Sequence, residues 1–127
     1  MCRIDYTLGK TGICYKVYII AKNQEDASKQ CKADGGYLIN VDTDVKYGNV
    51  KNLSGFPTTY TYIGGRRKDT NSPWMFEHGS TSGYFKWASE EADNRSNELC
   101  LVLNGSDKLM YDSSCSLSRP FVCELNV

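Results

Sequence analysis

Short runs of β-branched and aromatic residues, separated by turn residues, recur along the chain and predict strands. The longest is CYKVYIIA at residues 14–21, and a shorter apolar run, YLINV, occupies residues 37–41. Further strands are expected at YTYIGG (60–65), CLVLN (100–104), KLMYD (108–112) and FVCEL (121–125). Before the first strand, Gly9 and Gly12 suggest a small hairpin.

Two segments carry the signals of helices instead. NQEDASKQCKADGG (23–36) begins with an asparagine that can cap the helix, and it ends in a pair of glycines. Ala27 and Cys31 lie four residues apart and share its inner face. DTDVKYGNVKNL (42–53) predicts a second helix.

For this second helix we expect Asp42 to be the N-cap, and Val45, Val50 and Leu53 to be buried. Gly48 lowers the helix propensity of the segment. Residues 66–98 follow no regular pattern, apart from the short apolar runs at 74–76 and 84–87. Two early helices, followed by strands around a long loop, indicate an α+β fold, and loops of this length usually carry function.

Composition narrows the function. The chain has 127 residues, which fits one domain spanning 1–127, and equal numbers of acidic and basic residues give it zero formal net charge. This balance argues against a general nucleic-acid surface, and we interpret the one tight basic run, at 66–68, as a solvated loop.

No apolar run approaches the roughly 18–20 residues of a membrane span. Because residues 1–3 lack an apolar leader, we interpret the chain as a mature, processed form.

The chain has six cysteines and a single histidine, His78. This combination argues against a zinc site formed by the thiolates. The even number indicates disulfide bonds and therefore an oxidising, extracellular setting. Six cysteines allow 15 pairings, and Cys2 and Cys14 could close the small N-terminal hairpin.

His78 lies in a loop bordered by glycine, and no nucleophile motif accompanies it, so we do not expect an enzyme.

Several short motifs belong together: the helix carrying Cys31 with the following GGYLINV, then Tyr62-Ile63-Gly64-Gly65, Glu98-Leu99-Cys100, Asp112-Ser113-Ser114-Cys115 and Phe121-Val122-Cys123-Glu124. Taken together, they resemble the C-type lectin-like domain family over the whole chain. The resemblance implies a fold of two helices, small antiparallel sheets and a long irregular loop. It also implies three disulfide bonds: Cys2–Cys14, Cys31–Cys123 and Cys100–Cys115.

In sugar-binding members of that family a calcium ion sits in the long loop. The resemblance places its ligands at Glu91, Asp93, Glu98 and Asp112, whose carboxylates suit calcium chemically. Three departures favour the alternative, an acidic loop without metal. Ala92 replaces a cis proline, Tyr111 replaces an asparagine ligand, and no amide remains to donate to a sugar hydroxyl.

A second, structural calcium site of the family is not expected, because Arg67, Asn71 and Leu99 stand where acidic ligands would be needed. A sugar could also bind without calcium, through an aromatic face formed by Tyr111, Tyr84, Phe85 and Trp74. Core packing is the alternative role for Trp74 and Phe85. The residues that we expect at a ligand site are Glu91, Asp93, Asn94, Glu98, Tyr111 and Asp112.

Asn94 also belongs to a glycosylation sequon, as do Asn52 and Asn104. A glycan on Asn94 would obstruct this site. The sequence therefore predicts a secreted lectin that binds a glycan or glycoprotein through its long loop, in innate recognition or agglutination. A non-covalent homodimer would strengthen such binding. The alternative is a C-type-lectin-like domain that has lost sugar binding and acts as a protein-interaction or structural module.

Overall fold

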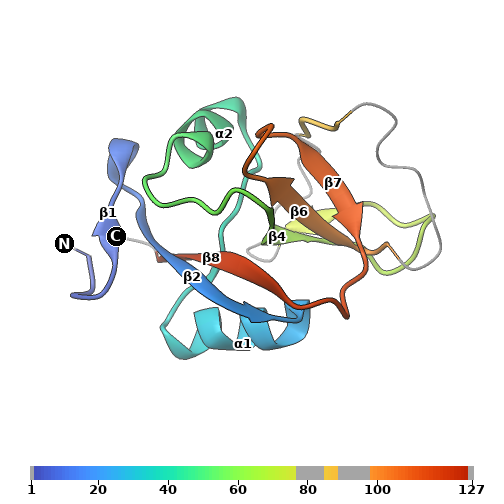
Figure 1. The fold of residues 1–127 in the computed structure, drawn as a ribbon, viewed down its shortest axis with the longest axis horizontal. Coiled ribbons are helices and arrows are strands. Elements are labelled where there is room, and N and C mark those ends of the chain that lie inside the picture. The colour runs from blue at the N-terminus through green and yellow to red at the C-terminus, as the bar shows by residue number, and fades with distance from the viewer. Residues whose placement is uncertain (1, 77–84, 89–97, 126–127) are drawn as a thin grey trace.

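The computed structural model describes residues 2–76, 85–88 and 98–125. In this part of the chain, eight strands form one sheet, with two α-helices and a short 3-10 helix (Lys10–Gly12) around it (Figure 1). The strands are β1 (Thr7–Leu8), β2 (Cys14–Lys22), β3 (Tyr37–Leu38), β4 (Tyr60–Arg66), β5 (Met75–Phe76), β6 (Cys100–Asn104), β7 (Met110–Ser113) and β8 (Arg119–Leu125). The helices are α1 (Gln24–Ala33) and α2 (Asp44–Lys51). The predicted α+β class is therefore confirmed.

The last strand of the chain, β8, lies at the centre of the sheet. The strand order is β1-β2-β8-β4-β6-β7, while β3 pairs with β8 and β5 with β4. The pairings are antiparallel except between β4 and β8, which run parallel where Tyr62 meets Phe121. This parallel contact joins the small antiparallel sheets that were expected into a single sheet.

The first helix forms as its sequence predicts. The Asn23 side chain accepts a hydrogen bond from the backbone N–H of Asp26 at 2.8 Å, which satisfies one of the open donors of the first turn. Gly35 follows the helix with a φ of 94°, a conformation that glycine adopts without steric cost. Ala27 and Cys31 are fully buried. The helix therefore packs on the sheet through the face that the sequence indicated.

The second helix begins later than predicted, and the proposed cap was wrong. Thr43, not Asp42, accepts the capping hydrogen bond, from the backbone N–H of Lys46 at 3.1 Å. Val50 and Leu53 are buried as expected, but Val45 is 64% exposed, and Tyr47 is buried in its place. Two residues correspond to about 200° around a helix, so Val45 and Tyr47 cannot face the same side.

All three implied disulfide bonds are present, Cys2–Cys14, Cys31–Cys123 and Cys100–Cys115, and they use every cysteine. The Cys31–Cys123 bond attaches α1 to the central strand β8. The Cys100–Cys115 bond joins β6 to the segment after β7, below the long loop. Neither α-helix in the described part of the chain is long and apolar enough to cross a membrane.

Two clusters of buried side chains form the core, and the two helices contribute to different ones. The first cluster contains Tyr47 and Val50 of α2 together with apolar residues of β4, β6 and β7. The second contains Ala27 and Cys31 of α1 with Tyr62 and Phe121. In Figure 1, α1 and α2 accordingly lie on opposite sides of the paired strands β2 and β8.

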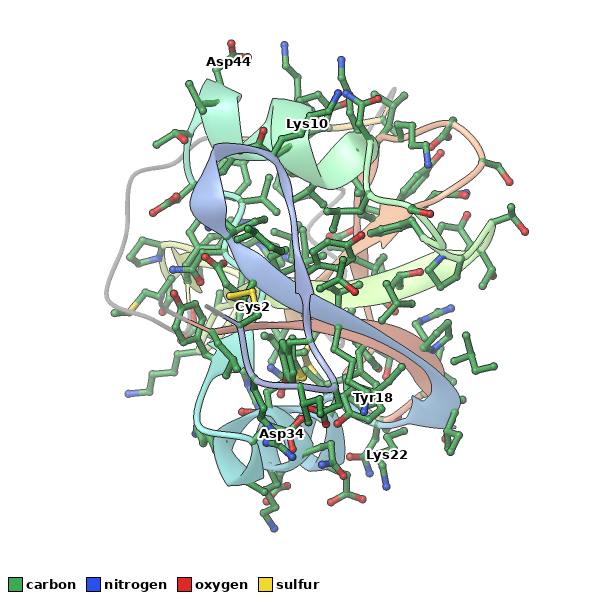
Figure 2. All side chains as sticks on the ribbon, turned by 90° about the vertical axis from the view of Figure 1, so that its left-hand side faces the viewer. Cys2, Lys10, Tyr18, Lys22, Asp34 and Asp44 are labelled. Carbon is green, nitrogen blue, oxygen red and sulfur yellow. A yellow bond between two sulfur atoms is a disulfide. The ribbon has the colours of Figure 1, made fainter. Side chains whose placement is uncertain are left out.

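Asp34, just after α1, connects the N-terminal segment to the sheet and the helix. Its Oδ2 accepts hydrogen bonds from the hydroxyls of Tyr6 at 2.8 Å and Tyr18 at 2.5 Å. Its Oδ1 accepts from Gln30 Nε2 at 3.2 Å and lies 3.3 Å from Arg3 Nη1. Figure 2 shows Asp34 and Tyr18 beside α1. Only 6% of the Asp34 side chain is exposed, so these contacts operate largely out of water.

The surroundings of Asp34 make its contribution to stability depend on pH. Burial acts to raise the pKa of Asp34, but hydrogen bonds from Tyr18 and Tyr6 and the charge of Arg3 outweigh it and hold this pKa below its usual range. Burial, with the adjacent carboxylate, raises the pKa of Tyr6 and Tyr18, so both hydroxyls remain donors at neutral pH. The pKa of Asp34 in the folded protein lies below its unfolded value of about 3.9. The stabilisation by Asp34 is therefore complete at pH values above about 3.9. It is lost as the pH falls through the folded pKa.

We therefore expect Asp34→Asn to lower the free energy of unfolding by about 1–2 kcal/mol at pH 7, because hydrogen bonds to a charged acceptor are replaced by weaker ones. The difference from the wild type should shrink as the pH falls from about 4 through the folded pKa, because the wild-type carboxylate then becomes protonated in the unfolded and finally in the folded state. Urea denaturation between pH 3 and 7 measures both effects. The matched control is Asp26→Asn, an exposed change in the first turn of α1, which should alter stability by less than about 1 kcal/mol. A difference that persisted undiminished at pH 3 would contradict this account.

Candidate functional site

Strands β6 and β7 carry two of the predicted ligand residues at the base of the long loop. Their antiparallel register places Asp112 opposite Leu101, and Tyr111 opposite Val102. Successive residues of a strand point to opposite faces of the sheet. The structure therefore separates Tyr111 from Asp112, although they are neighbours in sequence, and each has its own set of contacts.

Asp112 forms a buried ion pair with Arg67. Arg67 Nη2 lies 3.4 Å from Asp112 Oδ2, and the exposed fractions of the two side chains are 3% and 0%. The same nitrogen donates to the backbone carbonyl of Glu98 at 3.0 Å, and the backbone N–H of Arg67 donates to the carbonyl of Leu99 at 3.0 Å. The guanidinium carbon of Arg67 also lies 4.5 Å from the centre of the Trp74 ring, within cation–π range.

The glycines of the YIGG motif explain how Arg67 reaches this position. Gly65 of β4 packs directly against Leu101 of β6, where a Cβ atom would lie 2.6 Å from Leu101 Cδ2. This close approach lets the chain leave β4 beside β6, where Arg66 is paired with Cys100. Arg67 then points inward, toward Asp112 on β7, the strand beyond β6.

The burial of Arg67 overturns one expectation. The basic run at 66–68 was interpreted as a solvated loop, but Arg67 is only 4% exposed, while its neighbours Arg66 and Lys68 are exposed. Charge patterns in the sequence do not reveal a buried arginine, because its partner, Asp112, is 45 residues away. The one available signal was that Arg67 occupies a position where the family's second calcium site needs an acid.

Aromatic side chains gather on the long-loop side of the first core cluster. Phe85 stacks on Trp87 with ring centres 5.1 Å apart, and Trp74 lies 5.7 Å from Trp87 and 6.4 Å from Phe85. The segment around them is fixed to β7, because Met110 donates to the carbonyl of Lys86 at 2.7 Å. All three rings are half-buried. They therefore pack against the core, as the alternative role for Trp74 and Phe85 required, and also expose part of their surface.

Tyr111 belongs to a different surface. Its hydroxyl donates to the carboxylate of Asp107, and its ring packs edge-on against Tyr60 with centres 5.1 Å apart. The guanidinium carbon of Arg119 lies 5.1 Å from the centre of the Tyr60 ring. This group is attached to the second core cluster, on the face of the sheet away from Trp74. A single site cannot easily use both Tyr111 and the rings of Trp74, Phe85 and Trp87.

The described half of the predicted calcium site, Glu98 and Asp112, lies beside a cationic side chain. Asp112 already faces the guanidinium of Arg67, and the carbonyl oxygen of Glu98 accepts from the same group. Within residues 2–76, 85–88 and 98–125, no three His, Cys, Asp or Glu side chains are grouped so as to hold a metal. The other predicted residues, Glu91, Asp93 and Asn94, lie outside the described residues, as does Tyr84.

Comparisons with known proteins agree with this architecture. A human protein, C-type lectin domain family 7 member A, is 31% identical over 115 residues, which are 87% of this chain and 45% of that protein. A C-type lectin from the snake Hoplocephalus stephensii, described as a galactose-binding isoform, is 28% identical over 134 residues, covering 97% of this chain and 82% of that protein. The chain thus spans about half the length of the family 7 relatives.

Among solved structures, a calcium-independent type II antifreeze protein superposes with a TM-score of 0.84. It is 20% identical in sequence, and the superposition covers 98% of this chain and 93% of that one, so the likeness concerns the fold alone. The model of the lectin C-type domain matches residues 20–125, from the end of β2 to the last residue of β8. On this match, and on the disulfide framework and sheet described above, the chain belongs to the C-type lectin domain family.

Proposed function

We propose that this protein is a secreted carbohydrate-binding domain that binds a sugar at the base of its long loop without needing calcium. The family to which it belongs consists generally of binding domains, not enzymes. Three disulfide bonds favour an extracellular setting. The observation that carries the proposal is the guanidinium of Arg67, held between Asp112 and the ring of Trp74.

Electrostatics supports a site without calcium beside Arg67. A divalent ion about 4 Å from a guanidinium is repelled by about 8 kcal/mol at an effective dielectric constant near 20. Calcium sites with dissociation constants of 10⁻⁷–10⁻⁵ M gain roughly 7–10 kcal/mol in total, so this repulsion would cancel most of the gain. Arg67 instead supplies a permanent positive charge to the carboxylate of Asp112. In this arrangement the base of the loop is held together by a side chain of the protein itself.

The aromatic group offers a surface of the kind that sugars use. Binding sites for small molecules combine apolar walls with a few polar groups that fix orientation. The half-buried rings of Trp74, Phe85 and Trp87 provide the apolar wall, against which the C–H face of a sugar can lie. The carboxylates of Glu91 and Asp93, which were predicted to accept from hydroxyls, follow this segment in sequence. Their part in binding stays a prediction, as does that of Asn94.

A protein-interaction module is the second candidate function. One observation favours it: Ile19 and Ile20, consecutive residues of β2, are 80% and 68% exposed. The register of β2 against β8 shifts between Tyr18 and Lys22, and two large apolar side chains exposed at this irregularity are more typical of a contact surface than a single one is. This surface lies on β2, whereas the aromatic group lies beside β7, so the two functions can be tested separately.

A glycan array, read once in calcium and once in EDTA, tests the proposed sugar binding. We expect binding in both buffers. Phe85→Leu should weaken it about two- to tenfold, because it removes a stacking ring worth roughly 0.5–1.5 kcal/mol but keeps an apolar side chain. Tyr111→Leu, an aromatic change on the other face, is the matched comparison: unchanged binding supports the ring surface, whereas lost binding would place the sugar at Tyr111. Binding lost in EDTA would show that calcium is required. Silence in both buffers would support the protein-interaction module.

Replacing Arg67 tests whether it holds the base of the loop. We expect Arg67→Met to lower the free energy of unfolding by about 3–5 kcal/mol, because it leaves the carboxylate of Asp112 buried without its partner. Arg67→Met combined with Asp112→Asn should recover part of this loss, since no buried charge remains. Lys68→Met, an exposed neighbour, is the control and should cost less than about 0.5 kcal/mol. Equal losses for Arg67→Met and Lys68→Met, measured by urea denaturation, would contradict the role assigned to Arg67.

A further inference from the structure

A groove with a volume of about 670 Å³ runs between α1 and the ends of β4 and β5. Its size is that of a site for a small ligand. One wall is a single face of α1, which carries Glu25, Lys29 and Lys32. The opposite wall is formed by Arg66 and Lys68, at and just after the end of β4. None of these residues takes part in the proposed sugar site.

The walls of this basic groove carry an excess of positive charge, although the whole chain is neutral. Lys29, Lys32, Arg66 and Lys68 all have exposed side chains. Among the described lining residues the one carboxylate is that of Glu25, which lies 3.5 Å from Lys29 Nζ on the same helix. Four cations against one carboxylate leave an excess of three. Arg67 also lines the groove, but its charge is balanced by Asp112.

Two of the four cations lie on each wall of the basic groove, and the fold holds them in position. Lys29 and Lys32 are three residues apart in α1, so they lie about one turn apart on the same face. On the other wall, Arg66 Nη1 donates to Gln24 Oε1 at 2.7 Å, and Gln24 is only 2% exposed. This hydrogen bond to a buried amide orients the Arg66 guanidinium before any ligand arrives. Such an arrangement reduces the ordering cost of binding.

Apart from Arg67, whose charge Asp112 balances, the remaining lining residues are uncharged. Among them Phe76 is buried, Met75 is 52% exposed, and Ser28 adds a hydroxyl. A ligand that fits must therefore combine anionic groups at its sides with hydroxyls and an apolar face in its middle. We infer that the basic groove binds a linear sulfated saccharide, whose sulfate groups pair with Lys29 and Lys32 on one wall and with Arg66 and Lys68 on the other.

This site requires neither calcium nor the sugar site at the base of the long loop. A long nucleic acid is a poorer fit. Its phosphates would extend beyond the basic groove, where the rest of this protein, which has zero net charge overall, offers no excess of cations. Lys10 and Lys51 supply a matched control. Both are exposed, and they lie with α2 on the opposite side of the molecule from α1, as Figure 2 shows for Lys10.

The test is fluorescence anisotropy with a labelled heparin hexasaccharide, in EDTA, at 50 and 150 mM salt. We expect saturable binding that weakens with salt, and Lys29→Gln with Lys32→Gln should reduce the affinity about tenfold, as the loss of two ionic contacts predicts. Lys10→Gln with Lys51→Gln changes the net charge equally and should leave the affinity within twofold of the wild type. The Lys29–Glu25 pair is highly exposed, so the groove variant should remain folded, and a thermal melt of this variant is the check.

Three results would overturn the inference. The first is absence of binding by the wild type at 50 mM salt. The second is an equal loss of affinity in the groove variant and in the control variant, which would indicate attraction to overall charge. The third is equally tight binding of single-stranded DNA of the same charge, or of vesicles containing anionic lipid, which would show that the groove does not recognise a saccharide. The array on neutral glycans can fail while this experiment succeeds, so the two proposals are tested independently.

Discussion

The position of β8 at the centre of the sheet is the constraint on which the rest of the structure depends. This strand pairs with β2, β3 and β4, and it carries Cys123, which is bonded to Cys31 of α1. The segments that it joins lie up to about a hundred residues earlier in the chain. Because the contacts of β8 are made between distant segments, both core clusters form only when the chain closes on its last strand. The disulfide bond then makes that closure permanent.

The base of the long loop depends on the positive charge of one side chain, Arg67. A buried carboxylate at Asp112 requires a positive partner, and Arg67 provides one from the end of β4. Ion pairs of this kind contribute little net stability compared with apolar packing, but removing one partner is costly. The pair therefore fixes the geometry of the loop base more than it strengthens the fold. It also places Trp74 beside Phe85 and Trp87, which forms the aromatic surface.

The fold was largely predictable from local signals, and the site was not. Local structure at α1 and in the strands is set by contacts between residues close in sequence, such as the cap at Asn23 and the turn at Gly35. These effects can be inferred from a short stretch of sequence. The start of α2 was misplaced because Asp42 and Thr43 are both good caps, and a short stretch of sequence does not decide between them. The pairing of Arg67 with Asp112 arises from tertiary packing, which the sequence does not display. The resemblance to a family supplied the disulfide pairing, which composition alone left open.

The ends of the chain and the proposed sugar site lie at opposite edges of the sheet. Leu125, at the end of β8, pairs with Cys14 next to β1, whereas β7 and the aromatic group occupy the far edge (Figure 1). A tether attached at either end would therefore leave the loop base pointing away from the point of attachment. Several copies anchored to one surface would present their loop bases in the same direction. Weak individual contacts could then add up to high avidity for a surface that repeats the same sugar.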